Sequence, residues 1–222
     1  MKNIRIVDLS YDIEQTMMVY PGLSRPVLQW LATYNQEGHW SSKLTLPVHV
    51  GTHVDAPKHF MANGQSVDKI ALDCLVGEAV VCNLANFNLK IITRKDLEKY
   101  DQLIVSNRII ILNTGTYKQY QKPAFLEYPY LTPDAAQWLV AKAIRALGVD
   151  MMSIDPLGSR EATAHRILLG ANIPIIENLT NLDTLPDMQP FTFIALPLKI
   201  KDGEAAPCRA IALLPTDPVK GE

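Results

Sequence analysis

Cysteine is scarce in this chain, which limits the cross-links and metal sites that it can form. The 222 residues include three cysteines, Cys74, Cys82 and Cys208, which form no CxxC pair and leave one thiol over in any pairing. A disulfide framework needs an even, patterned set of cysteines, and a closed structural zinc site usually needs several thiolates. We therefore expect reduced and mostly buried thiols and no disulfide framework.

The chain also lacks an excess of charge of one sign and any long apolar run. Its 21 basic and 23 acidic residues give a formal net charge of −2, which offers no electrostatic footprint for nucleic acid or anionic lipid. No apolar run reaches the length of about 18 residues that a membrane helix needs. The first residues enter a polar–apolar alternation without an apolar signal segment. These absences predict a soluble, cytoplasmic protein that acts on a small molecule, without nucleic acid or membrane as a partner.

The length and the even composition predict one domain over residues 1–222. A chain of 222 residues can bury a hydrophobic core without help from a metal or a disulfide. We find no internal repeat, low-complexity tract or linker, and Asp217–Glu222 is the sole candidate for a tail.

The distribution of proline predicts a chain rich in strands. Fifteen prolines separate many short apolar runs, a pattern typical of strands joined by substantial loops. The expected fold class is α/β, a single domain with an extensive mixed β-sheet. The candidate strands are residues 4–9, 18–20, 27–30, 43–48, 78–84, 109–113, 151–154, 174–176, 191–197 and 210–214.

Three helices are predicted from their start and stop signals. Thr132 is a candidate N-cap followed by Pro133 in the first turn, and apolar positions continue at helical spacing to Leu147, before a stop at Gly148. A shorter helix is expected to begin after Thr93. Another is expected over residues 162–169, closed by a glycine at position 170.

The strongest chemical signal is the segment HVGTHVDAPKHF at residues 49–60. It holds three of the five histidines and one carboxylate. Because β-branched residues alternate with the polar ones, we expect an extended segment with one polar face. That face would carry His49, Gly51, His53, Asp55, Pro57 and His59. Imidazole and carboxylate groups suit Zn, Mn, Co or Fe, and the absence of cysteine favours an open, catalytic metal site.

A second set of ligands lies nearer the C-terminus. His165 falls on the helix expected over residues 162–169, and Glu177 follows the apolar run 173–176, where a buried carboxylate would need a cation. A two-metal site resolves this: His49 and His53 would bind one ion, His165 and Glu177 the second, and Asp55 would bridge them. Paired ions about 3.5–4 Å apart are typical of hydrolytic enzymes.

Other interpretations of these residues stay open. A non-enzymatic metal-binding or ligand-sensing module could use the same residues to hold an ion for structure. An iron site of the dioxygenase type needs two histidines and one carboxylate. The sequence GxSxG of serine α/β-hydrolases is absent, which disfavours an enzyme with a serine nucleophile of that kind. We expect His39 in a surface loop, Thr114-Gly115-Thr116 in a simple turn, and His59, beyond Pro57, outside the row of ligands as a proton-exchanging group.

The motif resembles a known family. The pattern HxGTHxDAPxHF, with Asp155-Pro156, His165 and the segment ENLTNL at residues 177–182, resembles the cyclase-like metal-dependent hydrolases, which include bacterial kynurenine formamidase (arylformamidase) and, more distantly, isatin hydrolase. The resemblance spans most of the chain, from the segment IVDLS at residues 6–10 onward. It implies a swivelling β/β/α fold and a homodimer or larger homo-oligomer.

The same resemblance implies a role for each matched residue. His49, His53 and Asp55 would bind one ion, and Asp55 would share the second with His165 and Glu177. His59 would act as proton donor and acceptor. The cofactors would be two divalent ions, Zn or Mn, which these ligands do not distinguish.

One departure from the family pattern concerns the substrate. Formamidases of this family typically carry Trp-Pro-Gly-Asp near the N-terminus, with the tryptophan against the aromatic substrate, where this chain has Tyr20-Pro21-Gly22-Leu23. Tyr20 is therefore the candidate substrate-binding residue. The expected reaction is cleavage of a C–N amide bond, in an aryl formamide such as N-formylkynurenine of the kynurenine pathway, by metal-activated water. The alternative is hydrolysis of another cyclic amide or a lactone.

Overall fold

Most strands belong to one mixed sheet that closes on itself. A computed structural model describes residues 4–85 and 89–215. The sheet order is β1 (Ile4–Asp8), β12 (Ala205–Pro215), β11 (Phe191–Pro197), β5 (Val76–Asn83), β7 (Ile109–Asn113), β9 (Ala146–Val149), β10 (Ile175–Glu177) and β4 (His53–Asp55). β4 pairs with both β10 and β12, which closes the ring, and β1 pairs with residues 211–215 of β12, on the edge opposite β11. The predicted α/β class with an extensive mixed sheet is confirmed.

The parallel strands β5, β7, β9 and β10 form the buried half of this sheet. In β7, Ile109 and Ile111 pack into the cluster inside the ring, whereas Ile110 and Leu112 pack into the cluster beneath the helices. All four side chains are fully buried. A strand covered on both faces needs apolar residues at every position, which explains why this run shows no alternation.

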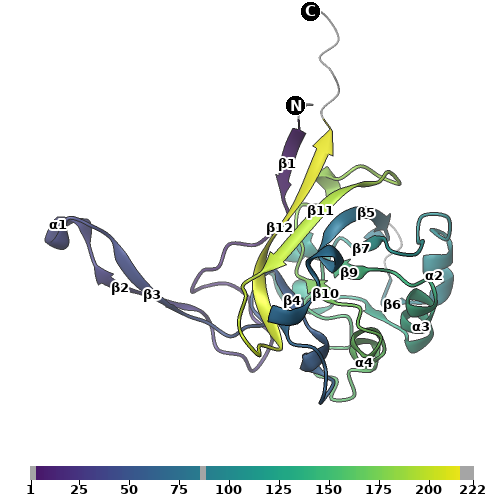
Figure 1. Ribbon diagram of the computed structural model, residues 1–222, viewed down its shortest axis with the longest axis horizontal. Helices are drawn as coiled ribbons and strands as arrows, with labels where there is room; N and C mark the ends of the chain where they lie inside the picture. The colour runs from purple at the N-terminus through teal and green to yellow at the C-terminus, as the bar shows by residue number, and fades with distance from the viewer. Residues whose placement is uncertain (1–3, 86–88, 216–222) are drawn as a thin grey trace, which may run out of the picture.

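Three helices gather on one side of the ring (Figure 1). They are α2 (Arg94–Glu98), α3 (Pro133–Ala141) and α4 (Thr163–Gly170). The predicted start signals are confirmed, because the Thr132 side chain accepts a hydrogen bond from the Ala135 amide and Thr93 forms a capping box with Asp96. The helix expected over residues 162–169 begins and ends one residue later than predicted.

Three expectations about secondary structure are wrong. The helix after Thr132 ends at Ala141, and residues 146–149, which match its apolar spacing, form β9 instead. Ala143 has φ of 52°, which breaks the helix, and the next apolar residues pair with β7 and β10. Gly148 accounts for the close packing there, since a Cβ would lie 2.8 Å from Leu179 Cδ1. Neither residues 18–20 nor residues 151–154 form a strand; both line the cavity described below.

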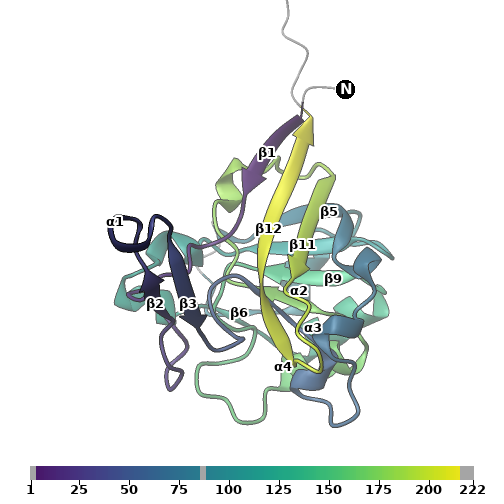
Figure 2. The same ribbon diagram turned by 60° about the vertical axis from the view of Figure 1, so that its left-hand side comes forward.

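A two-stranded arm stands apart from the ring (Figures 1 and 2). It consists of β2 (Val27–Ala32), the short helix α1 (Tyr34–Glu37) and β3 (Ser41–Thr45). The strand expected over residues 43–48 therefore begins earlier and stops at Thr45. A further short pair joins β6 (Ile91–Ile92) to β8 (Tyr130–Leu131).

The remaining expectations about the chain concern its thiols, its hydropathy and its tail. All three cysteines are free; Cys82 is buried, and the other two are partly buried. Within residues 4–85 and 89–215, no helix has the length and hydropathy needed to cross a bilayer. The predicted tail, Asp217–Glu222, lies outside the described residues.

Candidate metal centre

The pairing of β4 with β10 brings three of the predicted ligands to one face of the sheet. Glu177 lies directly opposite His53, and Asp55 lies opposite Ile175, two residues along each strand. Residues that are opposite one another, or two apart, in an antiparallel pair point to the same side. The side chains of His53, Asp55 and Glu177 therefore converge, and all three are almost fully buried.

The ligand segment is extended only over residues 53–55, so the expectation of one strand from His49 to His59 is wrong. Gly51 has φ of 58°, a left-handed conformation that turns the chain before the strand begins. After the strand, Pro57–His59 form a 3₁₀ turn. His49 and His59 thus reach the site from turns on either side of the strand, and their rings lie 4.1 Å apart between centroids.

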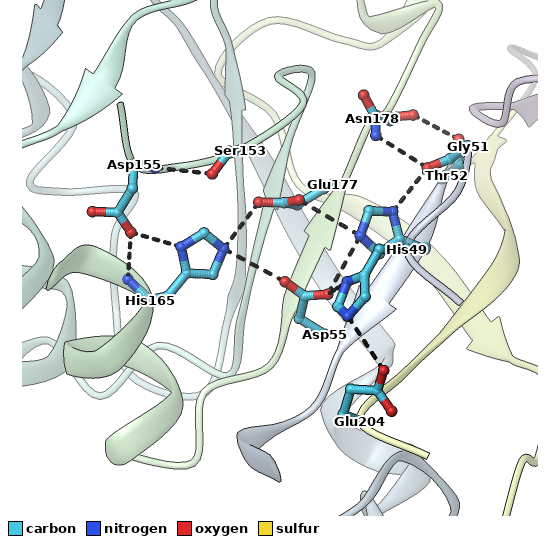
Figure 3. A network of polar contacts seen from close by, with 11 residues as sticks. His49, Gly51, Thr52, Asp55, Ser153, Asp155, His165, Glu177, Asn178 and Glu204 are labelled. Atoms are coloured by element: carbon cyan, nitrogen blue, oxygen red, sulfur yellow. Dashed lines mark hydrogen bonds and ion pairs between the residues drawn. The ribbon is translucent and has the colours of Figure 1, made fainter. Parts of the chain in front are cut away.

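Asp55 stands at the centre of the cluster (Figure 3). Its Oδ1 lies 2.9 Å from His49 Nδ1 and 3.3 Å from His53 Nε2, whereas its Oδ2 lies 3.5 Å from His165 Nε2. The two oxygens of one carboxylate thus face different histidines. This division matches the predicted bridging position.

Glu177 completes the second half of the cluster. Its Oε1 lies 3.2 Å from His165 Nε2, and its Oε2 lies 3.5 Å from His53 Nε2. All five predicted ligands are therefore brought together. The ligand atoms of His53, Asp55 and Glu177 lie within 4.8 Å of one another, as do those of His49, Asp55 and His59.

Several polar atoms in the cluster have no hydrogen-bond partner among the described residues. They are Nε2 of His49, Nε2 of His53 and both carboxylate oxygens of Asp55. Buried polar atoms in native proteins are almost always satisfied, so a group of them aimed at a common point indicates a missing partner. Nitrogen lone pairs and carboxylate oxygens are metal ligands, and a divalent cation fits this donor set.

The pKa shifts of Glu177 and His165 also favour a cation in the cluster. Burial, followed by the neighbouring charge of Asp55, raises the pKa of Glu177 above its usual value. Burial disfavours the charged form of His165, but the nearby carboxylates of Asp155, Asp55 and Glu177 outweigh it and raise the pKa of His165 well above 6.5. Without a metal, the cluster would therefore draw a proton to offset its negative charge.

His59 differs from the other histidines of the cluster. Burial is the largest influence on it and lowers its pKa to about 4, so the ring is neutral at neutral pH. Its side chain lines the same cavity as the ligands.

A cavity of about 260 Å³ opens directly onto the cluster. Its walls beyond the ligands are largely apolar and include Met18, Tyr20, Leu23, Phe60 and Met152. Tyr20 also accepts a hydrogen bond through its hydroxyl from the Gly158 amide at 2.7 Å. The candidate substrate-binding residue thus lies in the cavity wall and is held in place there.

His39 and residues 114–116, which were expected to play no part in the site, do not line the cavity. His39 is exposed in the β2–β3 arm and contacts the Glu37 carbonyl. Thr114 donates its amide and hydroxyl to the buried Asp150 carboxylate, and Gly115 has φ of 79°. Residues 114–116 therefore form a bend, held by a buried acid, that leads into the 3₁₀ helix Thr116–Gln119.

Asp155 holds one of the predicted ligands in place, and the sequence analysis assigned no role to it. Its Oδ2 lies 2.6 Å from His165 Nδ1, which fixes the ring so that Nε2 faces Asp55 and Glu177. The same carboxylate accepts the backbone amides of Ala164 and His165 in the first turn of α4. Asp155 therefore positions both the ring and the helix that carries it. The only sequence signal was its place in the Asp155-Pro156 pair.

Removing the charge of Asp155 should weaken metal binding. We expect Asp155→Asn to lower the affinity for Zn or Mn by about 10–100-fold, because a neutral amide holds the His165 ring less firmly and makes it a weaker donor. Competition with a chromogenic chelator measures this affinity. Asp183→Asn, at an exposed acid that lies 3.6 Å from Lys118, is the matched control. Unchanged affinity in Asp155→Asn, with only a lower unfolding temperature, would limit Asp155 to a structural role.

Comparisons with known proteins agree with this geometry. The family model described as "Putative cyclase" matches residues 7–156. Kynurenine formamidase from Bacillus anthracis is 33% identical over 212 residues, which cover 95% of this chain and 98% of the relative. Kynurenine formamidase from Bacillus thuringiensis subsp. konkukian is also 33% identical, over 220 residues with the same coverage.

Solved structures extend the likeness to the whole fold. Isatin hydrolase A from Labrenzia aggregata, bound to benzyl benzoate, superposes with a TM-score of 0.87 at 26% identity, covering 96% of this chain and 94% of that one. A predicted metal-dependent hydrolase from Bacillus stearothermophilus gives a TM-score of 0.81 at 28% identity, covering 95% and 98%. Since the family model covers most of the chain and the relatives cover nearly all of it, this chain belongs to the Putative cyclase family of metal-dependent hydrolases.

Proposed function

We propose that this protein is an amidohydrolase that cleaves the C–N bond of an aryl formamide, of which N-formylkynurenine is the reference compound. The observation that carries the proposal is the group of unpaired nitrogen and carboxylate atoms facing an apolar cavity. Such a site has ligands for a metal on one side and room for an aromatic substrate on the other. The names of the curated relatives support formamide as the substrate class.

The proposed cofactors are two divalent ions, Zn or Mn. His49, His53 and Asp55 would hold one, and Asp55, His165 and Glu177 the other. The opposite directions of the two Asp55 oxygens support this division. Ions in such a site lower the pKa of a bound water and polarise a carbonyl oxygen.

His59 is proposed to move the proton. Its neutral ring can accept a proton from the attacking water and pass it to the leaving nitrogen, which departs as the amine. The ring lies beside His49 in the cavity wall, where it would face a bound formamide. In this scheme neither Asp55 nor Glu177 transfers a proton.

The apolar wall supports an aromatic substrate. Tyr20 and Phe60 would contact an aryl ring, and Leu23 stands where formamidases of the family carry an acid. This last difference favours the second candidate, an enzyme that opens a cyclic amide or a lactone, and the likeness to isatin hydrolase A supports it as well. A purely structural ion is disfavoured, because a closed coordination shell would not adjoin an open cavity.

Three further predictions from the sequence remain proposals. They are a single functional domain over residues 1–222, a cytoplasmic location, and assembly into a homodimer or larger homo-oligomer. The proposed binding partner is a small-molecule substrate.

Restoration by metal tests the proposed reaction. Protein stripped by a chelator should be inactive on N-formylkynurenine, and reloading with Zn or Mn should restore turnover, followed by absorbance. Absence of turnover in protein shown to carry two ions per chain would reject the formamide and direct the assay to cyclic amides and lactones. Failure to bind any divalent ion would contradict the proposal as a whole.

Replacement of His59 tests the proton-transfer role. We expect His59→Ala to keep its metal and to lose about 10²–10⁴-fold in kcat, because general acid–base catalysis contributes this much. His39→Ala, at an exposed histidine of the arm, should have wild-type kcat. Full activity in His59→Ala would remove the residue from the mechanism, and loss of metal would make it a ligand.

A further inference from the structure

A loop of residues 156–161 forms part of the cavity wall. It joins Asp155 to the first turn of α4 and contains neither strand nor helix. Pro156 and Ser159 line the cavity, whereas the other four residues of the loop are exposed. This part of the wall has no packed core behind it. The position of the loop therefore depends on hydrogen bonds rather than on burial.

The two ends of the loop are held by Asp155 and by one arginine. At the start of the loop, the Asp155 carboxylate accepts two backbone amides of α4. At its end, the Arg166 guanidinium donates to the Glu161 carbonyl at 2.9 Å and to the Phe60 carbonyl at 3.1 Å. Both ends are thus tied to α4, and the second is also tied to the segment that carries His59.

The middle of the loop is held by a distant part of the chain. The Gly158 amide donates a hydrogen bond of 2.7 Å to the hydroxyl of Tyr20, which lies 138 positions earlier. The other hydrogen bonds of residues 156–160 run within the loop or to the residue that precedes α4. Across residues 4–85 and 89–215, the Tyr20 bond is therefore the sole hydrogen bond that joins residues 156–160 to another segment.

Tyr20 is itself well supported. Its side chain packs against the core cluster beneath the helices, and its carbonyl accepts the Leu23 amide at 3.0 Å. A tyrosine hydroxyl can accept a hydrogen bond, whereas a phenylalanine ring of the same shape cannot. The hydroxyl, and not the ring, therefore makes the contact with the loop.

The conformation of Gly158 makes this single bond important. The residue has φ of 76°, and glycine loses more conformational freedom than any other residue when its backbone is fixed. An exposed segment held only at its ends opens locally at low free energy. The Tyr20 hydroxyl thus opposes the opening of the middle of the loop.

We propose that the Tyr20 hydroxyl is a positioning group that holds residues 156–160 across the cavity, so that the loop forms a wall against which the substrate binds. Asp155 and Arg166 hold the ends of the loop independently, so the hydroxyl affects substrate binding and leaves the metal ligands in place. The kinetic part of this inference rests on the proposed function. The order of the loop does not depend on the reaction.

Hydrogen–deuterium exchange in Tyr20→Phe tests the order of the loop. The variant keeps the ring and removes the acceptor, and its unfolding temperature shows that it is folded. In metal-loaded protein, we expect peptides that span residues 156–161 to show exchange of the Gly158 amide about 3–10-fold faster than in the wild type, as the loss of one hydrogen bond implies. Tyr34→Phe, at a tyrosine of the arm that is 61% exposed, is the matched control and should leave this exchange unchanged. Unchanged exchange in Tyr20→Phe would overturn the proposal.

Steady-state kinetics and metal binding of the same variants test the assigned role. With N-formylkynurenine, Tyr20→Phe should raise KM about 3–10-fold and change kcat by less than about twofold, because a lost binding contact that is not specific to the transition state raises KM alone. Its affinity for Zn should equal that of the wild type. Unchanged KM would reject the link to substrate binding, and weaker Zn binding would place the hydroxyl in the metal centre instead. Absence of turnover in the wild type would reject the proposed function, and the exchange result would still decide the role of Tyr20 in the loop.

Discussion

Two carboxylates buried side by side require a neighbouring positive charge, and the rest of the site is arranged around them. Asp55 and Glu177 are each at least 96% buried, and both lie close to His53 and His165. Two adjacent negative charges in such a place are tolerated only when a cation or a proton offsets them. The surrounding imidazoles supply neutral donors for a cation, and the cavity leaves one side of the cluster open. This need for a cation agrees with the likeness of the chain to metal-dependent hydrolases.

Two features of the fold bring the proposed ligands together. They are the register between β4 and β10 and the carboxylate of Asp155. The β4–β10 pairing places His53 opposite Glu177, and closure of the ring through β12 holds β4 from its other side. Asp155 then fastens α4 and the His165 ring with one carboxylate. Four of the five proposed ligands therefore lie on strands or a helix, as a site that must keep its geometry through a reaction requires. They are His53, Asp55, His165 and Glu177.

The sequence identified side chains that converge in the structure better than it predicted the backbone that brings them together. His49, His53 and Asp55 could be found because residue types that bind metal are concentrated in one short segment, and this signal does not depend on conformation. The expected long strand there was wrong, because Gly51 turns the chain. Asp155 has no spacing signal, since its partnership with His165 exists only once α4 has formed. The residues 27–30 predict a strand, but not that the strand stands away from the core.

Anomalous scattering from crystals of the metal-loaded protein would test the central claim most directly. Data recorded at the zinc or manganese edge should show two peaks about 3.5–4 Å apart, with Asp55 between them and His53 and His165 on opposite sides. Such a map would show that the buried carboxylates share a pair of ions. A single peak that does not contact Asp55, or the absence of any peak at the cluster, would contradict the account.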